Sequence, residues 1–191
     1  MISEILLFLR LKLKIYQMNK LKLFCCFFFL LFLLSCNNKK DNVGNSANIY
    51  TNDFESFFGY LSHVQKGKAN SGQCYYAMDS TTEYSLTFME KFQNISTKSY
   101  AKIQFSVSML MANLEDNAAL VIQIWDGSGT PIKVESKIIS AKDIGVNKWS
   151  EATIDLNLKN LYAANHEVRC FVHNPSRQNL YLDDMTIEFF Q

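Results

Sequence analysis

Residues 179–190 read NLYLDDMTIEFF, and the pattern of these residues predicts a long strand near the C-terminus. Its apolar residues recur with the period of two that is typical of a strand buried on one face. The two alternating sets are Tyr181, Met185, Ile187 and Phe189 against Leu182, Asp184, Thr186 and Glu188. Strict alternation points the adjacent carboxylates of Asp183 and Asp184 to opposite faces. One of them must face inward, where an unpaired charge is costly, so it needs a cation or several hydrogen-bond donors.

A partner for this last strand is available near the start of the folded region. Residues 48–58 read NIYTNDFESFF and contain two further carboxylates, Asp53 and Glu55. Pairing of the two segments would close an all-β sandwich with its own termini. A bound metal ion is one way to neutralise the acidic residues that this pairing brings together.

The N-terminus has the features of a signal peptide over residues 1–35. Lys20 and Lys22 form a basic region, and residues 23–34 form an apolar stretch shorter than the roughly 18 residues of a membrane-spanning helix. The sequence Leu33-Leu34-Ser35-Cys36 resembles the bacterial lipobox, which implies lipidation of Cys36 and anchoring to the bacterial envelope, at the outer membrane or cell surface. An uncleaved N-terminal anchor is the alternative.

Residues 1–17 precede this signal, and we interpret them as an over-extended start, with Met18 as the initiator. Residues 36–47 are polar, which favours a flexible tether before a folded domain at 48–191. Lys39-Lys40-Asp41 resembles the charged export signals of surface lipoproteins of the Bacteroidetes type. A solvated linker explains the same residues.

The charge balance argues against nucleic acid as a partner. Without residues 1–35 the chain keeps 14 basic and 17 acidic residues, a formal net charge of about −3, with no basic run. Two cysteines remain in the domain, Cys74 and Cys170. They could form one disulfide in an exported protein, or each could stay free and buried on the apolar side of its strand.

The rest of the domain reads as short strands separated by turn residues, with no helix–strand alternation. We expect strands at residues 48–58, 73–78, 84–92, 101–110, 120–125, 132–139, 150–158, 167–172 and 179–190. Short helical turns are expected at 55–60 and 141–144. This pattern predicts a β-sandwich or jelly roll of about nine antiparallel strands.

The order of four short motifs resembles the galactose-binding-like jelly rolls, in particular the carbohydrate-binding modules of bacterial xylanases and glucanases. The motifs are DFE at 53–55, SGQCYY at 71–76, KWS at 148–150 and YLDDM at 181–185. The resemblance implies a structural calcium held by Glu55 and by Asp183 or Asp184, since calcium prefers oxygen ligands. The alternative is that the aspartates cap a turn and pair with basic residues. The family's tryptophan at Trp149 is structural, so we expect that residue in the core.

Alternation also predicts a ligand-binding face on the concave sheet that such modules have. The residues expected to face outward there are Gln123, Trp125, Glu135, Arg169, Phe171 and His173. Aromatic rings stack on the apolar side of a sugar, and amide or guanidinium groups bind its hydroxyls. Alternatively, Trp125 covers the sandwich rim and Arg169 pairs with Glu135 as a surface ion pair.

Three classes of function follow from this face. The first is non-catalytic binding of a polysaccharide or oligosaccharide, and the second is adhesion or assembly with another envelope protein. Catalysis would need two facing carboxylates, for which Glu135 and Glu167 are the only candidates on the expected face. No nucleophile elbow, HExxH motif or phosphate-binding loop occurs in the sequence. We therefore do not expect an enzyme.

Overall fold

The structure is a computed structural model and describes residues 46–191. The expected signal peptide, Cys36 and residues 36–45 of the expected tether lie outside the described residues. Within 46–191, no helix is long and apolar enough to span a membrane.

The described chain forms ten strands in two antiparallel sheets. The six-stranded sheet contains β1 (Ser46–Asn52), β2 (Val64–Lys66), β3 (Cys74–Met78), β5 (Lys102–Met111), β8 (Ser150–Asn157) and β10 (Leu180–Phe190). The four-stranded sheet contains β4 (Phe88–Lys91), β6 (Asn117–Trp125), β7 (Pro131–Ser140) and β9 (Glu167–His173). The short helices are η1 (Glu55–Phe57), α2 (Phe92–Ile95) and α3 (Ala141–Ile144).

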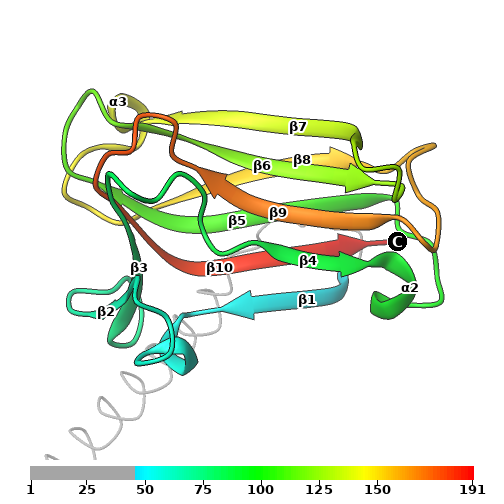
Figure 1. Cartoon of the computed structure of the whole chain (residues 1–191), viewed down its shortest axis with the longest axis horizontal. Helices are drawn as coiled ribbons and strands as arrows, with labels where there is room; N and C mark the ends of the chain where they lie inside the picture. Colours follow the sequence, from blue (N-terminus) through cyan, green and yellow to red (C-terminus); the bar gives the residue numbers. More distant parts are fainter. Residues whose placement is uncertain (1–45) are drawn as a thin grey trace, which may run out of the picture. The chain divides into compact units, whose positions relative to one another are not determined.

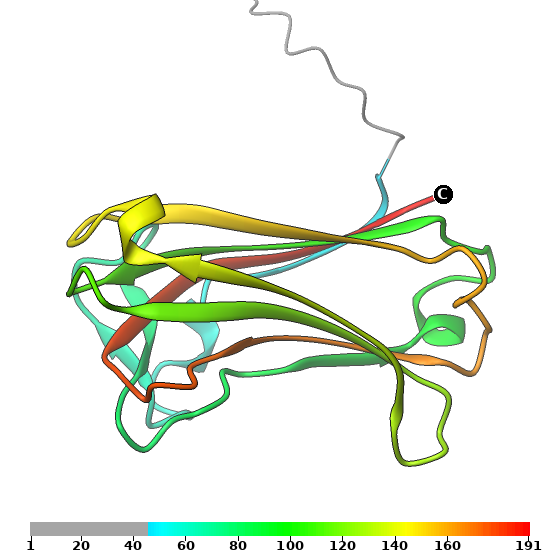
Figure 2. The ribbon, with the colours of Figure 1, turned by 90° about the horizontal axis from the view of Figure 1, so that it is seen from above.

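The two sheets pack face to face, and the chain crosses between them repeatedly (Figures 1 and 2). The six-stranded sheet runs β2-β3-β10-β5-β8, with β1 also paired to β10, and the four-stranded sheet runs β4-β9-β6-β7. Successive strands mostly alternate between the sheets, as in a jelly roll. The predicted fold class is confirmed. The expected pairing of the first and last strands is confirmed too, because Tyr50 lies opposite Ile187.

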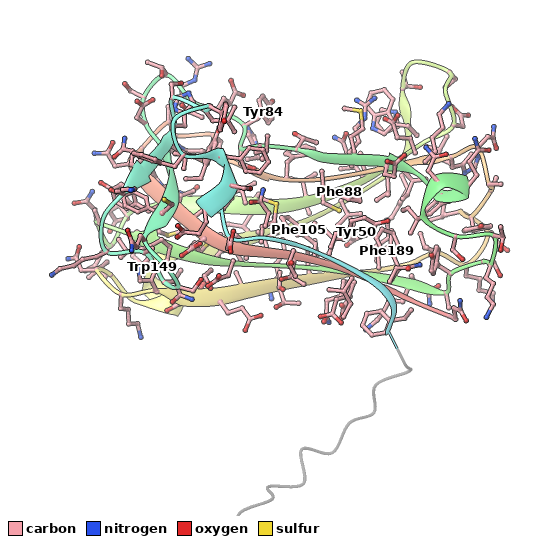
Figure 3. All side chains as sticks on the ribbon, turned by 90° about the horizontal axis from the view of Figure 1, so that it is seen from below. Tyr50, Tyr84, Phe88, Phe105, Trp149 and Phe189 are labelled. Atoms are coloured by element: carbon pink, nitrogen blue, oxygen red, sulfur yellow. The ribbon has the colours of Figure 1, made fainter. Side chains whose placement is uncertain are left out.

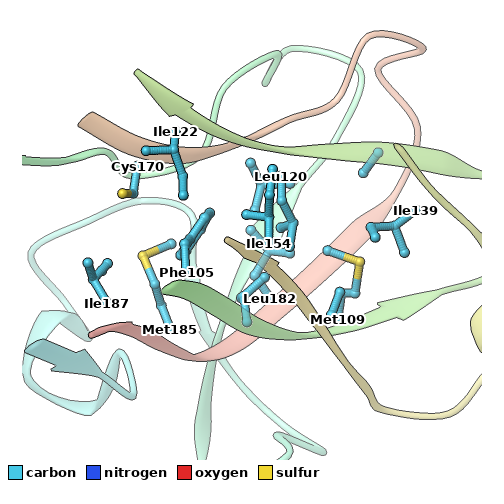
Figure 4. Close-up of a cluster of buried hydrophobic side chains, with 14 of the residues drawn as sticks. Phe105, Met109, Leu120, Ile122, Ile139, Ile154, Cys170, Leu182, Met185 and Ile187 are labelled. Carbon is cyan, nitrogen blue, oxygen red and sulfur yellow. The ribbon is translucent and has the colours of Figure 1, made fainter. Parts of the chain in front are cut away.

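The core fills the space between the sheets (Figure 4). Phe105 and Met109 of β5 point toward Leu120 and Ile122 of β6, and all four are fully buried. Burying a side chain of this size stabilises the fold by about 1.5–3 kcal/mol. Both sheets therefore use their alternate residues for one common core.

The alternation of core-facing and outward-facing residues in β10 shifts by one residue at the centre of the strand. Asp183 lies opposite Ser108 and Thr186 opposite Ser106, so two residues of β10 face one residue of β5. This is a β-bulge, and Asp184 occupies its left-handed position with φ 48°. Leu182 and Met185 consequently both enter the core. The prediction that Tyr181 shares the face of Met185 was wrong, because the bulge inserts one residue between them.

Several local expectations are corrected. Of the strand expected at 84–92, only Phe88–Lys91 forms a strand, β4, and Tyr84 makes an isolated bridge to His173. Strand β2 and helix α2 were not expected. Cys74 and Cys170 are free and buried in opposite sheets, so the disulfide alternative was wrong. Trp149 is half-buried on the outside of the six-stranded sheet, not in the core. It precedes β8, and its indole N–H donates to the carbonyl of Lys68 at 2.9 Å.

Candidate functional site

The outer face of the four-stranded sheet carries most of the predicted ligand-binding residues. In the pairing of β6 with β9, Trp125 lies opposite Glu167 and Gln123 opposite Arg169. Directly opposed residues of an antiparallel pair share a face. The alternate positions Ile122 and Ile124 are fully buried in the core. Gln123, Trp125 and Arg169 therefore face outward together, as predicted.

These side chains form one connected unit. The Arg169 guanidinium lies over the Trp125 ring, 4.0 Å from its centroid. Its Nε donates to Oε1 of Glu167 at 2.6 Å, and the Trp125 indole N–H donates to Oε1 of Gln123 at 2.9 Å. The stacking and the ion pair fix the plane of the guanidinium. Within residues 46–191, no hydrogen bond or ion pair engages its two terminal nitrogens.

Trp125, Glu167 and Arg169 of this unit form one wall of a pocket of about 300 Å³, here called the Trp125 pocket. Its lining residues are Lys91, Trp125, Asp126, Gly127, Gly129, Asn165, Glu167 and Arg169. The loop between β6 and β7, which supplies Asp126 and the glycines, projects from the sheet at this end (Figure 2). A volume of about 300 Å³ is at the lower end of the range of small-ligand sites. The pocket thus offers cations, carboxylates, an amide and one indole ring.

The opposite end of the same face is aromatic but largely covered. Phe171 and His173 lie on this face, opposite Val121 and Ala119. Phe171 is only 8% exposed, because Tyr84 packs edge-on against it with ring centroids 5.7 Å apart. Tyr84 also stacks on His173 at 4.9 Å and is itself 53% exposed. Tyr84, rather than Phe171, is therefore the aromatic surface available here.

Glu83 fixes the edge of this aromatic end. Its carboxylate accepts from Arg177 at 2.7 Å and lies 3.4 Å from Nε2 of His173. The hydrogen bond from Arg177 lowers the pKa of Glu83 below its usual value. Glu83 is therefore ionised at neutral pH and holds the segment before β4 against β9.

Glu135 does not lie on this face, so the prediction that it faces outward with Trp125 and Arg169 was wrong. It lies opposite the buried Ile122, while Val134 lies opposite Gln123. β7 is an edge strand, and charged residues that point inward protect such edges from pairing with other chains. Glu135 pairs with Lys133 at 2.8 Å and not with Arg169. Glu135 and Glu167 consequently do not form a facing pair of carboxylates.

Asp183 and Asp184 both contact one loop, at residues 70–71. Asp183 is fully buried, and its carboxylate accepts backbone N–H groups from Asn70 at 2.7 Å, Ser71 at 3.0 Å and Asp184 at 2.8 Å. Asp184 accepts from the side chains of Asn70 and Ser71. Burial raises the pKa of Asp183, and the N–H donors act against that rise. The prediction that the two carboxylates face opposite ways was wrong, because Asp184 occupies the bulge.

Glu55 binds the next part of that loop. Its Oε1 accepts the backbone N–H of Gln73 at 2.5 Å and of Cys74 at 2.7 Å, and these bonds lower the pKa of Glu55. Gly72 has φ +59°, and a Cβ there would lie 2.3 Å from this oxygen. Among the described residues, no three His, Cys, Asp or Glu side chains gather where they could hold one metal ion. Two described N–H groups donate to Glu55 and three donate to Asp183, and calcium binding stays a prediction.

Lys91, Asp126 and Asn165 of the Trp125 pocket were not predicted from the sequence. Lys91 enters because β4 pairs with β9 and brings it opposite Glu167. The turn residues after Trp125 were recognisable as a loop, but nothing in the sequence shows that this loop folds toward the pocket. Tyr84 was assigned to a strand with no role, and only its bridge to His173 reveals its position.

No family model matches this sequence, and no curated protein matches it. Among solved structures, the chain is similar to the CBM22-1-GH10 modules of Clostridium thermocellum endo-1,4-beta-D-xylanase 10B, complexed with xylohexaose, with 12% identity and a TM-score of 0.47. That match covers 75% of this chain and 25% of the xylanase chain.

Two single modules are similar over nearly their whole length. The CBM22-2 xylan-binding domain from Paenibacillus barcinonensis Xyn10C matches with 11% identity and a TM-score of 0.48, over 73% of this chain and 98% of that domain. The C-terminal family 22 carbohydrate binding module of Clostridium thermocellum Xyn10B matches with 12% identity and a TM-score of 0.49, over 78% and 96%. Likeness at this level assigns no function to the chain.

Proposed function

We propose that this domain binds carbohydrate without catalysis, and that the Trp125 pocket is the binding site. The arrangement of Arg169 carries the proposal. Its guanidinium is held flat on Trp125 and fixed at Nε by Glu167, which leaves the terminal nitrogens as donors at the pocket wall. Neighbouring hydroxyls of a sugar ring can accept from such a fork. The preorganised guanidinium loses little freedom on binding.

The other pocket residues suit the same ligand. Lys91 supplies a further donor, and Glu167 and Asp126 supply acceptors for sugar hydroxyls. The indole ring of Trp125 supplies apolar surface for C–H groups of the ring. We also propose, from the signal-like N-terminus and Cys36, that a lipid anchor holds the domain at the bacterial envelope.

A panel of plant and algal polysaccharides tests the proposal. The protein is residues 37–191, which contain every described strand and the described core. Retardation in gels that contain each polysaccharide is compared between this protein and Trp125→Ala. Losing the indole and the support of Arg169 should weaken binding at least tenfold, or about 1.4 kcal/mol. Trp149→Ala is the matched control, since it removes a half-buried tryptophan from the other sheet.

Retardation by a polysaccharide that is lost in Trp125→Ala and kept in Trp149→Ala supports the proposal. Equal retardation of all three proteins places the sugar elsewhere and overturns the assignment of the site. If no polysaccharide retards the protein, carbohydrate binding itself is wrong.

A second candidate function, binding of an envelope protein, has one observation in its favour. The outer face of the four-stranded sheet exposes Val134 at 46% and Ile138 at 75% on the edge strand β7, and Met89 at 52% on the opposite edge strand β4. Exposed apolar residues grouped on one face are typical of protein interfaces. The charged pocket around Trp125 favours sugar instead. A pull-down from the bacterial envelope with Ile138→Lys as the control variant distinguishes the two.

A further inference from the structure

A second cavity opens at the edge of the sandwich, between β1 and β4. Its volume is about 540 Å³. β1 pairs only with β10, and β4 pairs only with β9, so the free edges of both strands border the opening. Figure 3 views the molecule from this side and shows Tyr50 and Phe88 between the two sheets. The cavity therefore leads from solvent toward the core.

The side chains that line it become more polar toward the outside. Met185 and Ile187 of β10 are each 2% exposed and form the floor. Half-buried rings form the walls, with the Tyr50 and Phe88 centroids 5.0 Å apart. Exposed Asp53 and Ser56 lie at the mouth with the half-buried Asn52. The floor is thus apolar, while the hydroxyls of Tyr50, Thr51 and Thr87 are the hydrogen-bonding groups of the lining besides those at the mouth.

The apolar floor makes this cavity unsuitable for a sugar. A polyol placed on Met185 and Ile187 would lose hydrogen bonds to water, and the three hydroxyls of Tyr50, Thr51 and Thr87 are too few to replace them, which is costly. An apolar ring system or short chain gains from the same burial. A volume of about 540 Å³ falls within the range of sites for small molecules of drug size.

The negative charge of Asp53 at the mouth further restricts the kind of ligand that the cavity can bind. The Asp53 carboxylate accepts only the backbone N–H of Glu55, at 3.2 Å, and has no ion pair within residues 46–191. An anionic group entering beside it would be repelled. A neutral donor could use the free lone pairs of this carboxylate.

We propose that the cavity between β1 and β4 is a binding site for an uncharged, largely apolar small molecule, whose hydrogen-bonding end meets Asn52 and Asp53. This site does not depend on the Trp125 pocket, and the proposal stands or falls separately from carbohydrate binding.

Two fluorescent probes with the same ring system test it. N-phenyl-1-naphthylamine is neutral, and 1-anilinonaphthalene-8-sulfonate adds one sulfonate. The emission of each is titrated against residues 37–191 at constant ionic strength. We expect saturable enhancement with the neutral probe at one site per chain, and at least fivefold weaker binding of the sulfonate. Asp53→Asn should reduce that difference between the probes.

Ser56→Trp should block the mouth and weaken binding of the neutral probe at least tenfold. Ser56→Ala should bind that probe with an affinity within twofold of the parent protein's. Thr87→Phe blocks from the β4 side and replaces Ser56→Trp if circular dichroism shows that variant unfolded. The proposal is overturned if binding of the neutral probe does not saturate, or if the sulfonate probe binds more tightly than the neutral one. Unchanged binding of the neutral probe in the folded blocking variants overturns it too. Displacement of the probe by a polysaccharide also contradicts it.

Discussion

Replacement of Asp183 tests how the last strand organises its neighbours. The buried carboxylate accepts three backbone N–H groups, two from the loop at 70–71 and one from Asp184. Asp183→Ala leaves these donors without their partner. An unsatisfied buried donor costs about 1–3 kcal/mol, but Asn70 and Ser71 are exposed and can regain water. The Asp184 N–H left unsatisfied costs about 1–3 kcal/mol, and each of the two lost bonds to the loop contributes about 0.5–1.5 kcal/mol, so we expect a loss of about 3–4 kcal/mol in the free energy of unfolding.

Urea unfolding followed by tryptophan fluorescence measures this loss. In a domain of this size the melting temperature should fall by about 10 °C. Asp183→Asn is the matched control, because it keeps the shape and one acceptor oxygen, and it should lose about half as much. A loss below about 1 kcal/mol in Asp183→Ala would refute the reasoning, since the loop would then not depend on this carboxylate.

Three further outcomes follow from the same region. Hydrogen bonds from Gln73 and Cys74 lower the folded pKa of Glu55, so its stabilisation is present above the ordinary value of 4.5 and is lost as the pH falls through the lowered value. In Glu55→Gln the free energy of unfolding should therefore fall less steeply as the pH is lowered below 4.5. The same steepness in the parent protein and the variant would contradict this. Asp184 has φ 48°, so Asp184→Val should destabilise by about 2 kcal/mol more than Asp184→Gly in urea melts. If the carboxylates hold calcium, millimolar calcium should raise the melting temperature relative to chelator, and equal melting temperatures would count against it.

The arrangement of the sandwich could be predicted because it depends on alternation and on turns. β8, β9 and β10 lie within two residues of their expected ends, and β1 pairs with β10 as expected, although the acidic residues Asp53 and Glu55 that suggested the pairing lie beyond the end of β1. The phase of β10 could not be predicted, because an aspartate in a bulge resembles an aspartate in a regular strand. The bulge depends on hydrogen bonds to residues 70–71, which are more than 100 residues away in sequence.

The candidate site was predicted in part for a similar reason. Trp125, Gln123 and Arg169 lie on central strands, where burial of the alternate residues fixes the direction of each side chain. Glu135 lies on the edge strand β7, where an inward position still reaches solvent, so charge does not identify the outer face. Lys91 and Asn165 enter the pocket through strand pairing and loop folding, which local patterns do not encode.

Mapping of the bound sugar by NMR shows directly whether the Trp125 pocket is the binding site. Amide shifts of ¹⁵N-labelled residues 37–191 are followed during titration with an oligosaccharide from whichever polysaccharide retards the protein. The proposal predicts that the largest changes occur at Lys91, at residues 125–129 and at residues 165–169, together with the Trp125 indole N–H. Changes centred on Tyr75, Trp149 and Tyr181 of the other sheet, with the Trp125 indole unmoved, would contradict it.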